Sequence, residues 1–151
     1  MSIKLGVQVY SVRWDADADL KGALKKIKAM GYDGVELAGL YGNTPEDIRA
    51  WCEEIGLEPI SAHVPYPDLI TDPTTVLSQY KTIGCKYVAI PWLGEEDRPG
   101  SSDFAKTLEG IRLIGKCAQE LGIQLLYHNH DFYPTCVDLG LEQICLYFVI
   151  Y

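Results

Sequence analysis

The feature that most constrains the fold is a unit that recurs along the chain: an amphipathic stretch ends in glycine, and a short β-rich run follows at once. A glycine after a helix takes the left-handed conformation that ends it, and a strand that begins directly afterwards is typical of α/β proteins. The glycines are Gly31, Gly56, Gly84 and Gly122, and the runs that follow them are 32–37, 57–63, 85–91 and 123–128. With a first strand at 3–10, this alternation favours parallel strands joined by right-handed crossovers.

The stretches between the strands have the periodicity of helices over a sheet. Residues 19–30 place lysines on one face and apolar side chains on the other. The next helix begins at Thr44, whose hydroxyl is an N-cap, with a proline at the first helical position. Further helices are expected after Pro73 and over 102–121. The side chains predicted on the buried face of the first helix are Leu20, Ala23, Leu24, Ile27 and Met30.

Composition narrows the class of protein. The chain has 151 residues, of which 48% are hydrophobic, enough for the core of one domain. A net charge of −8 repels phosphate backbones, so we expect no nucleic-acid partner. No apolar run approaches the ~20 residues of a membrane helix, and the N-terminus does not resemble a signal peptide. Five scattered cysteines without a Cys-x-x-Cys pair predict reduced thiols in a cytoplasmic protein.

Two architectures fit the alternation, an open doubly wound sheet and a (β/α) barrel. An open dinucleotide-binding sheet should carry Gly-x-Gly-x-x-Gly after its first strand, and residues 11–15 contain no glycine. Polar side chains lie instead at the carboxyl ends of several strands, which is where barrels hold their active sites. The pattern therefore predicts a parallel TIM-type barrel. Because a whole barrel needs about 250 residues, the chain corresponds to about five to six of the eight β/α units.

Three histidines are candidates for a functional site. His128 and His130 lie two residues apart on a predicted strand, so their side chains share one face and suit a common metal ion or substrate. His63 ends the third strand. The structural alternatives are a hydrogen-bonded histidine pair at a loop edge and, for His63, a core histidine whose hydrogen bonds are satisfied.

Further candidates surround the same strand ends. Glu36 lies in an otherwise apolar strand, where a carboxylate is costly unless it is paired, metal-bound or solvated. Gln8 lies on the first strand, and Trp92 after the fourth could form an apolar wall for a ligand. Trp14 is a candidate wall in the same way. The charged run 95–98 is most simply a solvated loop.

Four segments together resemble the sugar phosphate isomerase/epimerase family of xylose isomerase-like, AP endonuclease 2-type TIM barrels. They are 5–13, 31–36, 61–65 and 127–132, in the order and spacing of that family's first five β/α units. The resemblance implies isomerisation or epimerisation of small sugars, sugar phosphates or inosose-like ketoses through an enediolate. It also implies a divalent metal, Mn²⁺, Mg²⁺, Co²⁺ or Zn²⁺, that polarises the carbonyl.

The resemblance also suggests roles for the candidate residues. His128 and His130 fall where the fifth strand supplies metal groups, and we expect a catalytic role for Glu36 and His63. Substrate contacts are expected from Gln8, Trp92 and Asn129.

The pattern departs from the family near its end. Tyr133 and Pro134 stand where the family usually continues with Glu-Phe, and the metal ligands of the sixth to eighth strands are missing. We interpret 1–151 as one N-terminal part of a barrel with an atypical tail at 134–151, from a truncated or frame-shifted gene. The apolar run 145–151 is either a sixth strand or an exposed segment.

Three functions stay open at this point. The first is the metal-dependent isomerase or epimerase, and the second is an inactive fragment or non-catalytic binding module. The third, an AP-endonuclease-like phosphodiesterase, is disfavoured by the acidic charge and by the presence of only three histidines. An incomplete barrel also leaves open sheet edges, through which we expect the chain to form homo-oligomers.

Overall fold

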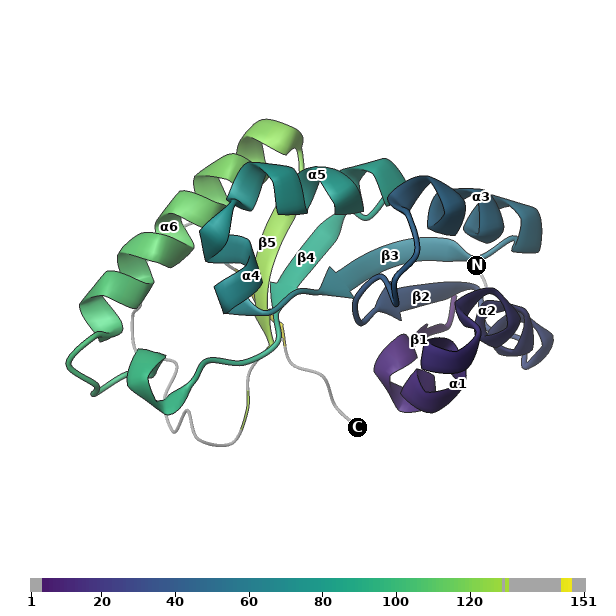
Figure 1. Ribbon diagram of the computed structural model, residues 1–151, viewed down its shortest axis with the longest axis horizontal. Coiled ribbons are helices and arrows are strands. Elements are labelled where there is room, and N and C mark those ends of the chain that lie inside the picture. The colour runs from purple at the N-terminus through teal and green to yellow at the C-terminus, as the bar shows by residue number, and fades with distance from the viewer. Residues whose placement is uncertain (1–3, 129, 131–144, 148–151) are drawn as a thin grey trace. The chain divides into compact units, whose positions relative to one another are not determined.

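The computed structural model describes residues 4–128, 130 and 145–147, and strands alternate with helices along the chain (Figure 1). The chain divides into two compact units. One comprises 1–63 and 79–86, and the other comprises 64–78 and 87–151. Helix α5 (Pro73–Ile83) contributes residues to both.

The first unit is built on three parallel strands. Strand β1 pairs with β2, and β2 pairs with β3. Its elements, in chain order, are β1 (Gly6–Gln8), the 3₁₀ helix η1 (Val9–Val12), α1 (Arg13–Ala18), α2 (Leu20–Ala29), β2 (Gly34–Leu37), α3 (Pro45–Ile55) and β3 (Glu58–His63).

The second unit is built in the same way. Strand β5 pairs in parallel with β4 on one side and with β6 on the other. Its further elements are α4 (Tyr66–Thr71), β4 (Tyr87–Ile90), the 3₁₀ helix η2 (Glu95–Asp97), α6 (Phe104–Leu121), β5 (Gln124–His128) and β6 (Cys145–Tyr147). In each unit the strands pair in chain order, as they do in a barrel, whereas a doubly wound sheet starts from a central strand. The predicted class, a parallel and partial (β/α) barrel, is confirmed.

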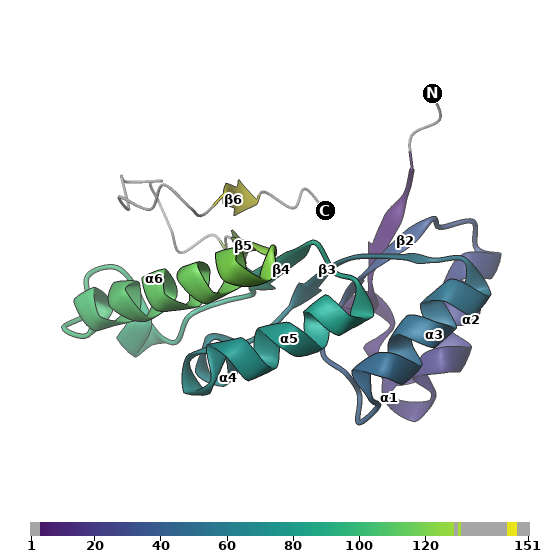
Figure 2. The same ribbon diagram turned by 90° about the horizontal axis from the view of Figure 1, so that it is seen from above.

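In the first unit, helices α2 and α3 lie on one face of the strands (Figure 2). Val35 and Leu37 of β2 are completely buried, as are Leu24 and Ile48 of the helices. Because side chains alternate along a strand, Glu36 lies on the opposite face from Val35 and Leu37. The helices thus cover the apolar face and leave the other to polar groups.

The predicted capping residues stand at the ends of the helices. The Thr44 hydroxyl accepts a hydrogen bond from the Asp47 N–H and so caps α3, and the Asp19 carboxylate caps α2 through Gly22. Gly56 ends α3 in the left-handed conformation, with φ of 76°. In the second unit, Gly122 ends α6 in the same way.

Three local predictions are wrong in detail. The first strand ends at Gln8, and 9–12 form η1, so the predicted strand at 3–10 is too long. Helices α1 and α4 were not predicted. Met30 is 68% exposed because α2 ends at Ala29 and Met30 is only its C-cap, beyond the face that the helix buries.

The tail is described only in part. Residues 145–147 form β6, so the strand interpretation of the apolar run is confirmed for these positions. Asn129 and residues 131–144 and 148–151 lie outside the described residues. Among the helices described, none is both long and apolar enough to cross a membrane.

Candidate active site

A polar cluster forms where the three strands of the first unit end. Gln8 is the last residue of β1, Glu36 is next to last in β2, and His63 is the last residue of β3. Gln8 lies opposite Glu36 in the strand register, and Glu36 lies opposite Ser61. Since aligned residues of parallel strands point to one face, these side chains gather on the face that the helices leave uncovered.

A register shift in β3 brings Ser61 and His63 to this face. Val35 pairs with Pro59, but Glu36 pairs with Ser61, so Ile60 is an additional residue in β3. Shifting a strand by one residue moves every later side chain to the other face. Without the shift, Ile60 would lie opposite Glu36.

The cluster is joined by short hydrogen bonds. Gln8 Nε2 donates to Glu36 Oε1 at 2.8 Å, and Ser61 Oγ donates to Glu36 Oε2 at 2.5 Å. His63 Nε2 lies 3.2 Å from Glu36 Oε1, and Gln8 Nε2 lies 3.0 Å from His63 Nδ1. Both carboxylate oxygens therefore accept hydrogen bonds, which compensates the burial of the charge.

Gln8 also contacts the His63 ring. Its Nε2 lies 3.0 Å from His63 Nδ1 and 3.2 Å from His63 Nε2, and because an amide nitrogen only donates, the ring nitrogen that accepts depends on the tautomer. The imidazole is thus held between the amide of Gln8 and the carboxylate of Glu36.

The Glu36 and His63 side chains are 12% and 11% exposed. A carboxylate and an imidazole in contact, with a small opening toward solvent, are groups that take a proton from a bound molecule and return it. The arrangement is suited to general acid–base chemistry.

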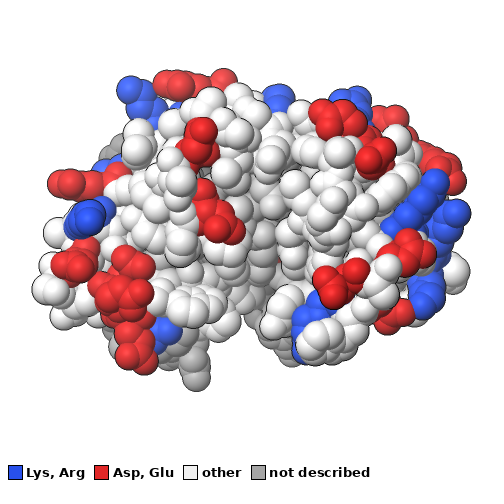
Figure 3. Space-filling model, in the orientation of Figure 1, with Lys and Arg blue, Asp and Glu red and all other residues white. Residues whose placement is uncertain are grey.

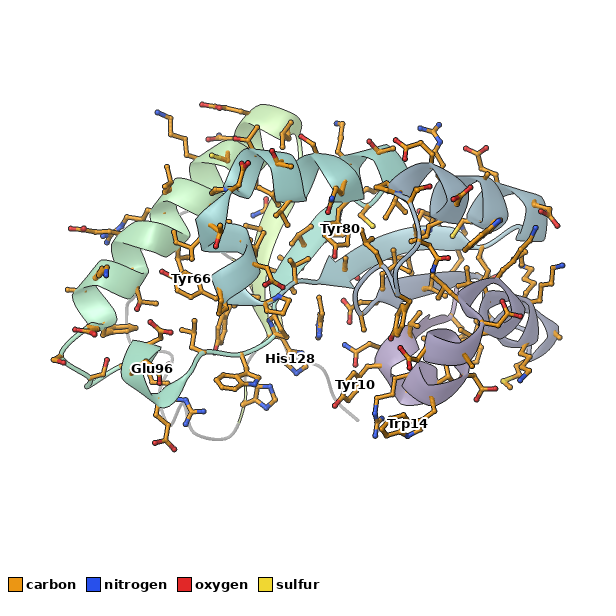
Figure 4. All side chains as sticks on the ribbon, in the orientation of Figure 1. Tyr10, Trp14, Tyr66, Tyr80, Glu96 and His128 are labelled. Carbon is orange, nitrogen blue, oxygen red and sulfur yellow. The ribbon has the colours of Figure 1, made fainter. Side chains whose placement is uncertain are left out.

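The second unit holds the histidine pair. His128 ends β5 and is buried, His130 is exposed, and their ring centroids lie 4.9 Å apart in an edge-to-face arrangement. His130 Nε2 donates to the Pro91 carbonyl oxygen at 3.0 Å, which fixes the hydrogen on Nε2. Figure 4 labels His128 among the side chains of this unit.

Trp92 follows β4 and is about half exposed. The Arg98 guanidinium lies over its ring, with Cζ 5.5 Å from the centroid, and Arg98 Nε donates to the Leu93 carbonyl. The exposed ring is consistent with the predicted wall for a ligand. That role stays a prediction.

The structure thus brings Gln8, Glu36 and His63 into one cluster and places His128, His130 and Trp92 in the other unit. Ser61 belongs to the first cluster but was not among the predicted site residues. The available signal was its position two residues before His63 on a strand, which places both side chains on one face.

The described residues do not form a complete binding site for the predicted divalent metal. In the part of the chain that the structure describes, no group of three or more His, Cys, Asp or Glu side chains could hold a metal ion. Two imidazoles alone are fewer than the three or four protein ligands of a typical zinc site. Metal binding by His128 and His130 therefore stays a prediction.

Charge is mixed over the face drawn in Figure 3, where acidic side chains gather over η2 and basic side chains of α2 stand beside acidic ones. Lys21 pairs with Glu54 at 2.6 Å, and Lys26 pairs with Asp15 at 2.5 Å. The lysines of α2 are thus partly neutralised rather than gathered into a basic surface.

No protein-family model matches the chain. The inosose dehydratase of Geobacillus kaustophilus (strain HTA426) is 25% identical over 131 residues, covering 71% of this chain and 42% of that protein. A sugar phosphate isomerase/epimerase from Parabacteroides distasonis ATCC 8503 superposes with a TM-score of 0.76 at 22% identity, covering 97% of this chain and 68% of that one.

A xylose isomerase-like TIM barrel protein from Mycobacterium smegmatis, solved in complex with magnesium, superposes with a TM-score of 0.69 at 14% identity. The match covers 95% of this chain and 63% of that one. The chain has the fold of the xylose isomerase-like TIM barrels. The resemblance predicted from four sequence segments is therefore confirmed at the level of fold. The chain spans less than half the length of the curated relative that it matches.

Proposed function

We propose that this chain forms part of an isomerase or epimerase of small sugars, sugar phosphates or inosose-like ketoses. The observation that carries the proposal is the contact between Glu36 and His63, oriented by Gln8 and Ser61 at the carboxyl ends of three parallel strands. The fold neighbours support the substrate class, because they include a sugar phosphate isomerase/epimerase.

In the proposed reaction, the Glu36 carboxylate takes the proton from the carbon beside the substrate carbonyl. The electron pair of that C–H bond forms the enediolate. Return of the proton to the neighbouring carbon, with transfer of the hydroxyl proton from one oxygen to the other, gives the isomer, whereas return to the opposite face of the same carbon gives the epimer. His63 lies in contact with Glu36 and orients its carboxylate. Gln8 contacts the imidazole and holds the ring beside Glu36.

We further propose that His128 and His130 contribute to binding a divalent metal. The support is the place of His128 at the end of β5 with His130 two residues beyond it, the 4.9 Å separation of their rings, and the magnesium complex of a fold neighbour. A metal at such a site polarises a carbonyl oxygen. Its identity, among Mn²⁺, Mg²⁺, Co²⁺ and Zn²⁺, is part of the test.

The test is an activity screen against ketoses, ketose phosphates and inosose, with each of the four metals added in turn. We expect Glu36→Gln to abolish conversion and Glu53→Gln, a surface glutamate paired with Arg49, to retain it. His130→Ala should lower the metal content measured by mass spectrometry. A protein that binds none of these metals and converts no ketose contradicts the proposal.

The alternative is a non-catalytic module that binds a sugar at the same polar cluster. It is favoured by the incomplete metal donor set of the described residues. The same screen separates the two, because a binding module gives saturable sugar binding by calorimetry without conversion.

We also propose self-association through the outer strand edges. Strand β1 pairs with β2 alone among the described strands of its unit, and such edges offer backbone donors and acceptors to another strand. Light scattering at micromolar concentration should report a dimer or larger assembly. A monodisperse monomer would overturn this part of the proposal.

A further inference from the structure

Two residues beyond Gln8, the chain carries a cluster that the proposed mechanism does not use. The guanidinium of Arg13 lies over two aromatic rings, with Cζ 4.5 Å from the Tyr10 centroid and 4.9 Å from that of Trp14. Arg13 Nη1 donates to the Tyr10 carbonyl at 3.1 Å. Figure 4 labels both aromatic residues beside η1 and α1. These contacts hold the guanidinium in one place at the end of β1.

The two rings are exposed. Trp14 is 76% exposed and Tyr10 is 57% exposed. Single exposed aromatic residues are common, but two rings that share one arginine form a continuous platform for a ligand. Nothing in the proposed proton transfer requires them, so their position beside the strand end calls for another function.

The arginine keeps hydrogen-bonding capacity. Within residues 4–128, 130 and 145–147, no carboxylate oxygen lies within ion-pair distance of Arg13, whereas nearby Asp15 is paired with Lys26. A guanidinium donates in its own plane, so contact with ring faces leaves its donors available. Paired N–H donors of this kind match the oxygens of a phosphate or carboxylate.

Another aromatic residue, Tyr41, lies in the loop after β2. Tyr41 has a φ of 52°, in the left-handed region that non-glycine residues rarely adopt. Asn43 holds this turn by donating its side-chain amide to the carbonyls of Leu40 and Tyr41. Burial and the nearby Asp17 raise the pKa of Tyr41, while Arg13 lowers it, so the arginine and this hydroxyl interact electrostatically.

We propose that Arg13, with Tyr10 and Trp14, forms an anion-binding subsite that takes the phosphate group of a phosphorylated sugar. The sugar part rests on the proposed function. The inference that the subsite binds an anion rests on Arg13, whose guanidinium lies over two exposed aromatic rings just after β1. Among the substrates of the proposed function, this inference selects the sugar phosphates. Asp17 lies four residues after Arg13 on α1, on the same face of the helix, so its negative charge opposes anion binding.

The test is a binding titration followed by NMR at the Trp14 indole N–H, assigned with a Trp14→Phe variant. The probes are inorganic phosphate, a neutral ketopentose and its 5-phosphate. We expect the 5-phosphate to bind at least about tenfold more tightly than the neutral sugar, a difference of about 1.4 kcal/mol. Arg13→Gln should remove this preference, Arg13→Lys should retain part of it, and Asp17→Asn should increase it.

The outcomes separate this inference from the proposed function. Phosphate binding that depends on Arg13, without binding of either sugar, supports the anion subsite and contradicts the sugar substrate. Equal affinity for the neutral and phosphorylated sugars overturns the subsite and leaves the proposed function standing. A phosphate preference that survives Arg13→Gln in a folded variant, checked by circular dichroism, also overturns it. Arg13→Lys keeps the test decisive if Arg13→Gln does not fold.

Discussion

Ser61 donates a hydrogen bond to Oε2 of Glu36 across 2.5 Å, from a strand whose register shifts by one residue just before it. The hydroxyl is buried, and it holds the oxygen of the carboxylate that Gln8 and His63 do not contact. The orientation of the proposed base therefore depends on an irregularity in β3.

Replacing Ser61 with alanine should lower the free energy of unfolding by about 1–3 kcal/mol, because a buried carboxylate oxygen loses its donor. Urea denaturation measures the change. The control is Ser78→Ala, whose hydroxyl bonds the Thr74 carbonyl within one helix and should change stability by less than about 0.5 kcal/mol. If the two substitutions lower the free energy of unfolding equally, the hydrogen bond from Ser61 to Glu36 stabilises the fold no more than the helix bond of Ser78.

The closely packed layer below the site gives a second prediction. A Cβ on Gly34 would lie 2.7 Å from Ile60 Cδ1 and 2.8 Å from the Glu58 carbonyl oxygen, whereas one on Gly6 would approach only Ile60 Cδ1 within 3 Å. Gly34→Ala should cost about 1–3 kcal/mol of stability through overpacking. Gly6→Ala should cost less.

The matched test of this layer is Ile60→Val, which removes Cδ1. In a double-mutant cycle it should restore most of the stability lost in Gly6→Ala and only part of that lost in Gly34→Ala. The reason is that the Glu58 carbonyl remains in place near Gly34. Equal restoration at both positions would refute the role of the backbone contact.

A pH dependence follows from Glu58. Lys86, followed by Lys4, holds the pKa of this carboxyl below its ordinary value. A carboxyl whose pKa is lowered by folding stabilises the protein above its unfolded pKa, and the contribution is lost as pH falls through the folded value. Glu58→Gln should therefore be less stable than the parent at pH 7 and equal to it in strong acid.

The size of the Glu58 effect should be small, since all three side chains are more than a third exposed. It should also shrink in high salt, which screens exposed charges. Thermal unfolding of both proteins from pH 7 to pH 2, at low and high salt, measures it. A stability difference that is the same at every pH would contradict the ion-pair explanation.

Thiol reactivity gives a fourth prediction. Burial raises the pKa of Cys52 to about 11 and that of Cys85 to about 12. The thiolate is the reactive form, so both should resist iodoacetamide at pH 8, while the partly exposed Cys117 should be labelled first. Mass spectrometry of labelled peptides checks the order, and labelling in urea should make the three alike. Rapid labelling of Cys85 in the native protein would contradict its burial.

Much of the fold could be predicted because its signals are local. Gly56 and Gly122 end helices by a conformation that their own lack of a side chain permits, and Thr44 caps α3 through a residue three positions away. The length of β1 could not be predicted. Residues 9–12 have the composition of a strand, but η1 forms there because tertiary contacts outweigh local preference.

The candidate site was predictable residue by residue but not as an arrangement. A glutamate in an apolar strand and a histidine at a strand end are visible in the sequence, so Glu36 and His63 were selected. Ser61 was missed: its place two residues before His63 put it on the same face, but its role depends on the hydrogen bond to Glu36, which joins residues 25 positions apart.

The sequence by itself determined the alternation of strands and helices, the parallel class of sheet and the strand ends that carry polar groups. These follow from periodicity and from residues within a few positions of one another. Only the tertiary structure decided the shift at Ile60 and the contacts of Glu36 with Gln8, Ser61 and His63. Those contacts join residues 25 or more positions apart, and register between strands is set by packing across the sheet rather than by either strand alone.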